Sequence, residues 1–146
     1  MTPIQHTTGN ATRCKATLAQ IPHFAGLPSA VQDAIAAAAL PRHFEAGQVI
    51  YLEGEPAEHV YILERGWIKA TRMSRDGREQ AMLFLCPVDI FGDVAVFTGT
   101  SYPGTVTTLE TVEVWSIPGA TLIDLVQQSP ELAMAVIHKL GERVLH

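Results

Sequence analysis

The feature that most constrains the fold is a series of short apolar segments, separated by glycine and proline, between residues 42 and 117. Turn signals occur at Ala46-Gly47, Gly54-Glu55-Pro56, Arg65-Gly66 and Asp76-Gly77. The segments between them have strand length and cover residues 49–52, 59–63, 67–73, 80–85, 105–109 and 112–117. Many short strands at regular turn spacing predict an antiparallel β jelly roll or barrel.

Helical signals precede this strand region. Ser29 with Gln32 resembles a capping box, and the helix that follows should stop before Pro41. Residues 1–23 have weak periodicity, so we expect a loose N-terminal arm with a short helical piece at 17–23.

Helical spacing returns after the strands. Residues 121–128 predict one helix, and Ser129 as N-cap with Pro130 at the first helical position predicts a second. In this second helix an apolar residue recurs every four positions, at Leu132, Val136, Leu140 and Val144. We expect this stripe to have no partner within the chain and to form a parallel homodimer.

Length and composition describe one globular domain. The chain has 146 residues, 47% of them apolar, and a net charge of −5. No apolar run approaches the roughly 20 residues of a membrane helix, and the N-terminus lacks a signal-peptide core, so we expect a cytoplasmic protein without membrane contact. Two cysteines, Cys14 and Cys86, do not form a disulfide framework.

The charge pattern argues against nucleic-acid binding by this chain. Proteins that grip nucleic acid usually present a basic patch, because phosphate contacts supply much of the affinity. The nearest candidate is a group of four cations, at Lys69, Arg72, Arg75 and Arg78. It surrounds the turn Asp76-Gly77, so we interpret it as a solvated hairpin.

A glycine–carboxylate motif, Phe91-Gly92-Asp93, precedes a short apolar turn and then Ser101-Tyr102-Pro103-Gly104-Thr105. It resembles the phosphate-binding cassette of cyclic-nucleotide-binding domains in Crp/Fnr-type transcription regulators. That cassette contains an Arg for the cyclic phosphate, and this chain has Pro103 in its place. No Lys or Arg occurs from Gly92 to Val114. The resemblance therefore implies the scaffold of a nucleotide site without the cation that neutralises phosphate.

The resemblance extends over residues 24–146. Its other motifs are Phe24-x-x-Leu27, Gly47 with Glu53-Gly54-Glu55, Tyr61-Ile62-Leu63-x-x-Gly66, Asp76-Gly77-Arg78-Glu79 and Ile117-Pro118. It implies a jelly roll that binds an effector (24–128) and the beginning of a dimerisation helix (129–146), after the N-terminal arm (1–23). The DNA-reading helix-turn-helix domain of the family has no counterpart in this sequence, so we expect contact with DNA only through a C-terminal domain that this chain lacks.

The same resemblance locates a candidate pocket. We expect its boundary to comprise Ala70, Met82, Leu83, Phe91, Gly92, Asp93, Val94, Pro103, Gly104 and Thr105. Gly92 either lets its backbone approach a ligand or only permits a corner between strands. Asp93 matches the glutamate that receives the sugar hydroxyl in the family, although capping of residues 94–97 is the favoured interpretation. Arg143 matches a long-helix Arg that reaches this carboxylate, or else it is a solvated charge.

Other chemistry finds little support in the sequence. No HxH pair suggests a cupin-type metal site, and no nucleophile elbow, P-loop or paired-carboxylate motif suggests an enzyme. We expect no metal and no cofactor. Single residues such as His6, Cys14, Cys86 and His138 do not make a haem site, and one N-terminal cysteine cannot hold an iron–sulfur cluster.

The sequence therefore predicts the effector-sensing domain of a Crp/Fnr-type regulator whose cassette lacks the phosphate-binding Arg. The effector would be an unidentified small molecule. One alternative is a genuine cAMP- or cGMP-binding module with an atypical cassette. Further alternatives are a ligand-free interaction scaffold, whose own side chains fill the pocket, and a haem-based gas sensor.

Overall fold

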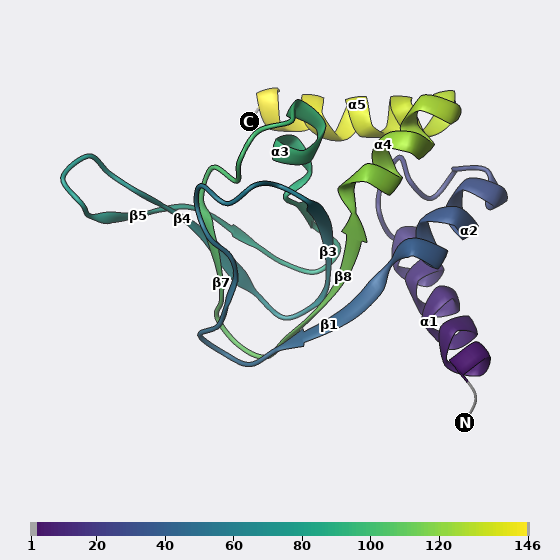
Figure 1. Ribbon diagram of the computed structural model, residues 1–146, viewed down its shortest axis with the longest axis horizontal. Helices are drawn as coiled ribbons and strands as arrows, with labels where there is room; N and C mark the ends of the chain where they lie inside the picture. Colours follow the sequence, from purple (N-terminus) through teal and green to yellow (C-terminus); the bar gives the residue numbers. More distant parts are fainter. Residues whose placement is uncertain (1–2, 146) are drawn as a thin grey trace.

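The computed structural model describes the backbone of residues 3–145 and the side chains of residues 9–80 and 83–142. Two four-stranded antiparallel sheets face each other (Figure 1). The first has the order β1 (Leu40–Phe44), β8 (Val112–Pro118), β3 (His59–Arg65), β6 (Ile90–Phe91), and we call it the inner sheet. The second, the outer sheet, has the order β2 (Val49–Tyr51), β7 (Thr105–Thr108), β4 (Ile68–Met73), β5 (Glu79–Leu85). The predicted jelly-roll class is confirmed.

The inner sheet is buried on both faces, and its central strand β3 contains the continuous apolar run Val60-Tyr61-Ile62-Leu63. Alternate residues of a strand point to opposite faces. Val60 and Ile62 of β3 belong to one apolar core, while Tyr61 and Leu63 belong to the other. Sheets covered on both faces have such continuous apolar runs.

Four helices cover the outward face of the inner sheet: α1 (Pro3–Leu18), α2 (Ser29–Ala38), α4 (Gly119–Gln128) and α5 (Pro130–Leu145). Together they form the helical core, in which Leu18, Ile35, Leu122 and Leu132 pack around Trp115 of β8. The space between the two sheets is the barrel core, which contains Tyr51, Tyr61, Phe91 and Val106. A short helix, α3 (Asp93–Thr98), lies between β6 and β7.

The N-terminal arm differs most from the structure that the sequence predicts. Residues 3–18 form a helix, and Cys14, Leu18 and Ile21 are fully buried. Residues 17–23 do not form the predicted separate helix, because α1 ends at Leu18 and hydrogen-bonded turns follow. The helix has few strong helix formers, so packing on the sheet supplies the stability that its own sequence lacks.

The two predicted caps had different outcomes. Ser29 is the first residue of α2 and makes no side-chain capping bond, and the Gln32 amide instead donates to the carbonyls of Ala25 and Leu27. The capping box is therefore wrong. In α5 the prediction is confirmed, since the Leu132 N–H donates to Ser129 Oγ at 3.2 Å.

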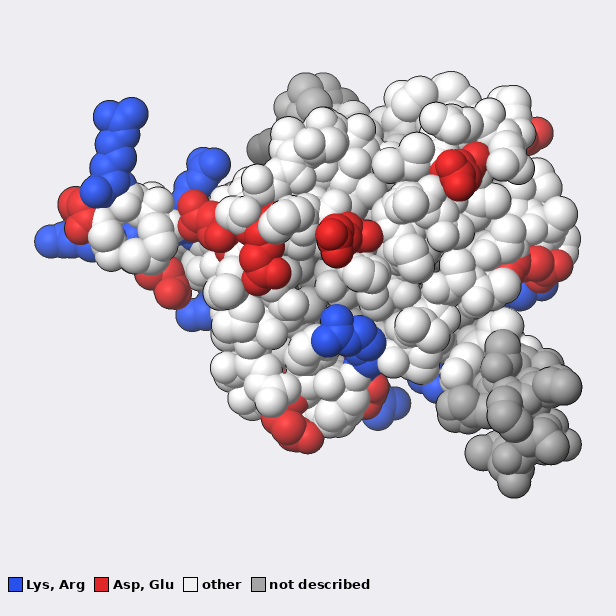
Figure 2. Space-filling model, viewed as in Figure 1, with Lys and Arg blue, Asp and Glu red and all other residues white. Residues whose placement is uncertain are grey.

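The hairpin of β4 and β5 projects from the body of the molecule (Figure 1). Its turn is the predicted Asp76-Gly77, with Gly77 at φ +83°. Lys69 pairs with Glu79 at 3.3 Å and Arg78 with Asp76 at 3.7 Å. Figure 2 shows basic and acidic side chains side by side on this hairpin, as expected of a solvated element. Across the described residues, no helix combines the length and apolarity that crossing a membrane requires.

The stripe on α5 faces inward, which corrects the premise of the dimer prediction. Leu132 and Val136 are buried in the helical core, and Leu140 packs against it. The side chain of Val144 lies outside the described residues. Among the described side chains of α5, the large apolar ones that are exposed are Met134 and Ile137, at 50% and 57% exposure. Periodicity predicted the stripe correctly, but its partner is this chain's own sheet.

Candidate binding pocket

A cavity of about 220 Å³ opens in the barrel core between the outer sheet and α3. Its lining comprises Tyr51, Ala70, Leu83, Leu85, Ile90, Phe91, Gly92, Asp93, Val94, Ala95, Pro103, Gly104 and Val106. The residues come from β2, β4, β5, β6, β7, α3 and the loop between α3 and β7. The jelly roll therefore brings together segments that lie far apart in the sequence.

Most of the predicted boundary lies around this cavity. The structure places Ala70, Leu83, Phe91, Gly92, Asp93, Val94, Pro103 and Gly104 in the lining. Thr105 is not part of the lining, and its Oγ1 accepts the backbone N–H of Glu53 at 2.9 Å. The side chains of Met82 and Arg143 lie outside the described residues. Whether these residues bind a ligand remains a prediction.

Sequence reasoning missed five lining residues. They are Tyr51, Leu85, Ile90, Ala95 and Val106. All are apolar or aromatic, and four of them lie in strands. The alternation of side chains along paired strands could have identified Val106. Ala70 lies opposite both Leu83 and Val106, and residues paired across strands point to the same face of the sheet.

Gly92 has a structural reason to be glycine. Its φ is +79°, and a Cβ there would lie 3.1 Å from the His59 carbonyl oxygen and 3.2 Å from Tyr102 Cε1. This geometry supports the corner interpretation. Gly92 also lines the cavity, so its backbone can border a ligand as well.

Asp93 is a buried carboxylate at the first position of α3. The N-cap position of this helix is Gly92, and Asp93 lies in its first turn, where a carboxylate is favourable. Asp93 lines the large cavity and also a void of about 20 Å³ in the helical core, which Lys139 of α5 borders as well. It thus lies between the pocket and α5. The predicted Asp93–Arg143 pair stays a prediction.

The described lining contains no Lys, Arg or His. Two nearby hydroxyls that could have helped to hold a phosphate have other partners. The Tyr102 hydroxyl donates to the His59 carbonyl at 2.7 Å and accepts the His59 N–H at 3.2 Å. Thr105 Oγ1 accepts from Glu53, as described above. A phosphate site requires donors and positive charge, and the described lining residues do not include a basic side chain.

Aromatic rings form the floor of the barrel core. Tyr51 stacks on Tyr102 with ring centroids 3.7 Å apart, and Tyr61 stacks on Phe91 at 5.1 Å. Burial raises the pKa of both Tyr61 and Tyr102, so these phenols are neutral over the physiological range. Of these rings, Tyr51 and Phe91 line the pocket and give it an aromatic wall.

The neighbouring helix α3 packs directly on the beginning of α4. A Cβ on Gly119 would lie 2.8 Å from Val96 Cγ1 and 3.1 Å from the Glu58 carbonyl oxygen. The Gly119 N–H also donates to that carbonyl at 2.7 Å. The backbone of α4 at Gly119 thus packs directly against the Val96 side chain of the helix that carries Asp93.

The thiols and the metal-ligating side chains do not form a second site. Among the described residues, no three or more His, Cys, Asp or Glu side chains are arranged to hold a metal ion. Burial raises the pKa of the Cys14 thiol to about 12. Desolvation and the Asp89 carboxylate raise the pKa of the Cys86 thiol, which disfavours the reactive thiolate.

Residues 41–129 match the sequence model of the cyclic nucleotide-binding domain. The chain belongs to this domain family. It is 28% identical over 127 residues to the CRP-like cAMP-activated global transcriptional regulator of Mycobacterium tuberculosis, covering 87% of this chain and 57% of that protein. It is 31% identical over 106 residues to the global nitrogen regulator of Synechococcus elongatus, covering 70% and 47%. The chain thus spans about half the length of these relatives.

Solved structures agree. The N-terminal domain of a transcriptional regulator from Streptomyces coelicolor superposes with a TM-score of 0.72 and 25% identity, covering 88% of this chain and 90% of that one. The sensor domain of the transcriptional regulator DNR from Pseudomonas aeruginosa has the same fold, with a TM-score of 0.81 at 20% identity, covering 92% and 90%. The resemblance to the sensing half of a Crp/Fnr-type regulator is confirmed.

A relative that is an enzyme shares this domain only. The match with lysophospholipase NTE1 of Coccidioides immitis covers 69% of this chain but 6% of that protein. The likeness therefore carries no information about hydrolytic chemistry in this chain.

Proposed function

We propose that this chain is the effector-sensing domain of a Crp/Fnr-type transcription regulator and that its pocket does not serve a cyclic phosphate. The observation that carries the proposal is the cavity wall at the cassette. Pro103, which the sequence resemblance aligns with the phosphate-binding Arg, lines the cavity together with the buried Asp93, and the Tyr102 hydroxyl donates to the His59 carbonyl. An empty cavity of about 220 Å³ also argues against a scaffold whose own side chains fill the pocket.

The expected affinity for cyclic nucleotides follows from the missing cation. A charge-assisted hydrogen bond contributes roughly 1.5–3 kcal/mol, and desolvation of an unpaired phosphate costs more. We expect dissociation constants of at least about 100 μM for cAMP and cGMP. Isothermal titration calorimetry measures them directly, and a low-micromolar value would contradict the proposal.

A variant pair tests the role of the cassette position. Pro103→Arg should tighten cAMP binding, because it restores a bidentate donor for phosphate. Pro103→Gln is the matched control, since it removes the ring and adds a polar side chain without charge. Equal affinities for the two variants would show that charge at residue 103 is not what limits nucleotide binding.

A second candidate function is a genuine cAMP-binding module. The family match and the cAMP-activated regulator among the relatives favour it. It would require binding through backbone amides or through side chains outside the described residues. The same calorimetry separates the two functions.

Assembly is proposed through the outward face of α5. Met134 and Ile137 are exposed there, and Gly141 lies one turn further along with no heavy atom within 4 Å of a Cβ built on it. Small and apolar residues on one helix face permit close helix packing.

We assign any contact with DNA to a helix-turn-helix domain outside these 146 residues, and the assembly through α5 is a separate proposal. Sedimentation of Ile137→Asp, compared with the wild type, tests the dimer.

A further inference from the structure

A second cavity, of about 320 Å³, opens between α1, the end of β3 and the loop from β5 to β6. We call it the α1 groove. It shares no described lining residue with the barrel cavity, so the two spaces are separate. Small-molecule sites have volumes of about 300–1,000 Å³, and the groove reaches that range. Its polar and charged lining residues are Arg13, Thr17, Gln20, Glu64 and Arg65.

A β-bulge in β3 brings two oppositely charged neighbours into this groove. The pairing of β3 with β8 shifts between Leu63 and Arg65, so Glu64 is the extra residue. Consecutive residues of a regular strand point to opposite faces, whereas a bulge can re-aim a side chain. Leu63 is buried in the barrel core, and both Glu64 and Arg65 line the groove. The bulge therefore presents a carboxylate and a guanidinium from consecutive positions.

Arg13 of α1 is a second cation in the groove, and contacts on two sides hold it in place. Its Nη2 donates to the two carboxylate oxygens of Glu64, at 3.1 Å and 3.4 Å. Its guanidinium also lies over the ring of Trp115, 5.1 Å from the ring centroid. Both contacts with Glu64 use one nitrogen, and the side chain is 52% exposed, so other N–H groups of the guanidinium remain available to an anion.

The Arg65 side chain forms no ion pair with another described residue. The residue opposite it on β8 is Glu113, whose carboxylate lies 2.7 Å from His43 Nδ1 instead. A guanidinium can donate two parallel hydrogen bonds to one carboxylate. Arg65 is therefore available to a carboxylate that enters the groove.

The loop from β5 to β6 gives the groove a fixed apolar wall. Pro87 and Val88 line the groove, and Val88 has a φ of +62°, which a β-branched residue rarely adopts. Such a conformation persists where the surrounding structure holds it. The Val88 N–H donates to the Leu63 carbonyl at 3.0 Å, and the Leu63 N–H donates to the Asp89 carbonyl at 2.9 Å. These bonds fix the loop on β3, so the groove is bounded by charged groups and by a fixed turn.

We propose that the α1 groove binds an α-amino acid with an acidic side chain. Arg13 and Arg65 bind the two carboxylates of the ligand, and Glu64 accepts its ammonium group. The charges are complementary, because the described lining carries two positive charges and one negative charge. An α-amino acid has its carboxylate and its ammonium group on one carbon atom, which matches the consecutive positions of Arg65 and Glu64. The site is independent of the cassette pocket and of the sensing function proposed for it.

Three ligands that differ by one group test the proposal. They are L-aspartate, succinate, which lacks the ammonium group, and L-asparagine, which lacks the second carboxylate. Isothermal titration calorimetry on the whole chain should show aspartate binding at least about tenfold more tightly than either of the others. A smaller advantage over succinate or over asparagine would overturn the proposal. Absence of aspartate binding would overturn it as well.

Variants locate the site. Arg65→Gln should weaken aspartate binding by at least about tenfold. Arg72→Gln is the matched control that should leave it unchanged, because Arg72 is exposed on β4 outside the groove. Glu64→Gln should remove the advantage of aspartate over succinate. If Arg65→Gln does not fold, Ala16→Glu at the exposed wall of the groove should weaken aspartate binding through repulsion. Unchanged aspartate affinity in these groove variants would overturn the proposal.

The Pro103→Arg variant separates the groove from the cassette pocket. It changes the lining of the barrel cavity and leaves the groove intact, so it should bind aspartate as tightly as the wild type does. A changed aspartate affinity would place the ligand in the barrel cavity and overturn this inference. The cAMP titrations test the sensing function alone, because cAMP lacks the amino-acid group that the groove would bind.

Discussion

The helical core and the barrel core share the inner sheet but differ in how well they are filled. On the helical side, the void that Leu18, Ile35 and Leu132 border measures about 20 Å³. On the barrel side, the cavity measures about 220 Å³. Protein interiors are normally packed nearly as tightly as organic crystals. The side chains around the larger cavity therefore lack van der Waals contacts that a filled core would have.

The contrast assigns different tasks to the two faces of one sheet. The helical core stabilises the domain, and the barrel core leaves room for a ligand. Ile90 and Asp93 border both spaces, so they form the contact between the two regions. The predictions below test this division, from the largest expected effect to the smallest.

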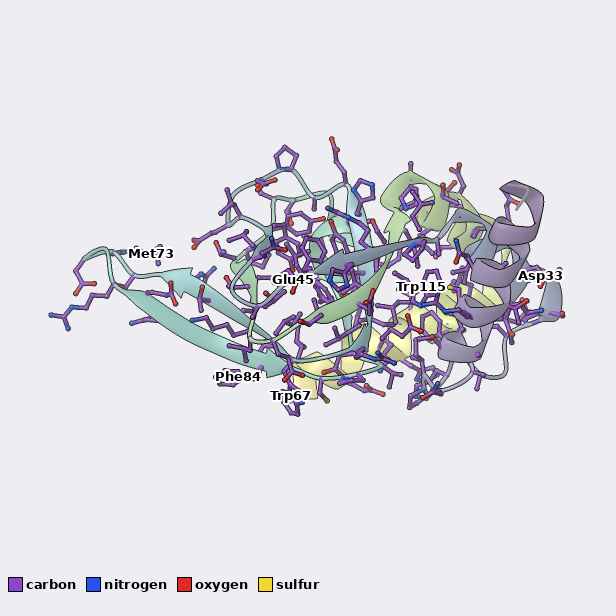
Figure 3. All side chains as sticks on the ribbon, turned by 90° about the horizontal axis from the view of Figure 1, so that it is seen from below. Asp33, Glu45, Trp67, Met73, Phe84 and Trp115 are labelled. Atoms are coloured by element: carbon purple, nitrogen blue, oxygen red, sulfur yellow. The ribbon has the colours of Figure 1, made fainter. Side chains whose placement is uncertain are left out.

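Removing the largest buried side chain of the helical core should have the greatest effect. Trp115 is a residue of β8, and its fully buried side chain belongs to the helical core (Figure 3). We expect Trp115→Ala to lower the free energy of unfolding by about 3–5 kcal/mol. Urea unfolding followed by circular dichroism measures it. Trp67→Ala is the matched control, because Trp67 is 48% exposed at the outer margin of the molecule; an equal loss there would refute the division.

The two faces of α5 should respond differently to truncation. Leu132 is fully buried, and we expect Leu132→Ala to lower the free energy of unfolding by about 2–5 kcal/mol. Ile137→Ala should change it by no more than about 0.5 kcal/mol in the monomer. Unfolding curves at low protein concentration isolate this comparison. A larger loss for Ile137 would show that α5 packs through its other face.

Adding volume should separate the filled core from the hollow one. Ala135 is buried in the helical core, and Ala135→Val should lower the free energy of unfolding by about 1–3 kcal/mol through overpacking. Ala70 lines the cavity on β4, where a β-branched residue fits, so Ala70→Val should be neutral or stabilising. Thermal unfolding of both variants tests this. Equal destabilisation would mean that the cavity closes in solution.

The smallest effect concerns pH and a surface cluster. His43 Nδ1 lies 2.7 Å from Glu113 Oε1, and its Nε2 lies 2.8 Å from Glu45 Oε1. The hydrogen bonds to Glu113 and Glu45 raise the pKa of His43, and the bond to His43 lowers the pKa of Glu45. The stabilisation that His43 contributes is therefore fully present below its unfolded-state pKa of 6.5, and it is lost as the pH rises through the raised folded-state pKa. The stabilisation that Glu45 contributes is present above its unfolded-state pKa of 4.5, and it is lost as the pH falls through the lowered folded-state pKa.

The cluster thus stabilises the domain most between pH 4.5 and pH 6.5, the unfolded-state pKa values of Glu45 and His43. The pH profile of the melting temperature should show a shallow decline on the alkaline side that His43→Gln removes. A profile that is the same in both proteins would show that these exposed contacts contribute nothing, as many surface ion pairs do.

Local signals predicted six of the eight strands and missed β1 and the two-residue strand β6. All six predicted segments became strands with shifts of one or two residues at their ends, because turns at glycine and proline fix where a strand can lie. The strand β1 was missed because Pro41 and the polar residues Arg42 and His43 hide it. As an edge strand it tolerates a proline that a central strand would not.

Local sequence signals did not predict which residues far apart in the sequence would be in contact. The periodicity of α5 predicted an apolar stripe at Leu132 and Val136 but not which surface buries it. In α1, Cys14 and Leu18 carry the packing, and neither the composition nor the spacing of that segment indicates a helix. The pocket was located by the cassette motif. Tyr51, Ile90 and Val106 join it only because two sheets close on each other.

The contact between Gly119 and Val96 has a mechanical consequence. Because the backbone of α4 at Gly119 already touches the Val96 side chain of α3, no free space separates the two at this point. A ligand that pushes α3 from the pocket side toward α4 must therefore displace either the Val96 side chain or the beginning of α4. A ligand that draws Asp93 inward would instead open a gap at Gly119. The direction in which α3 is displaced, rather than the size of the ligand, would then determine whether the long helix receives the signal.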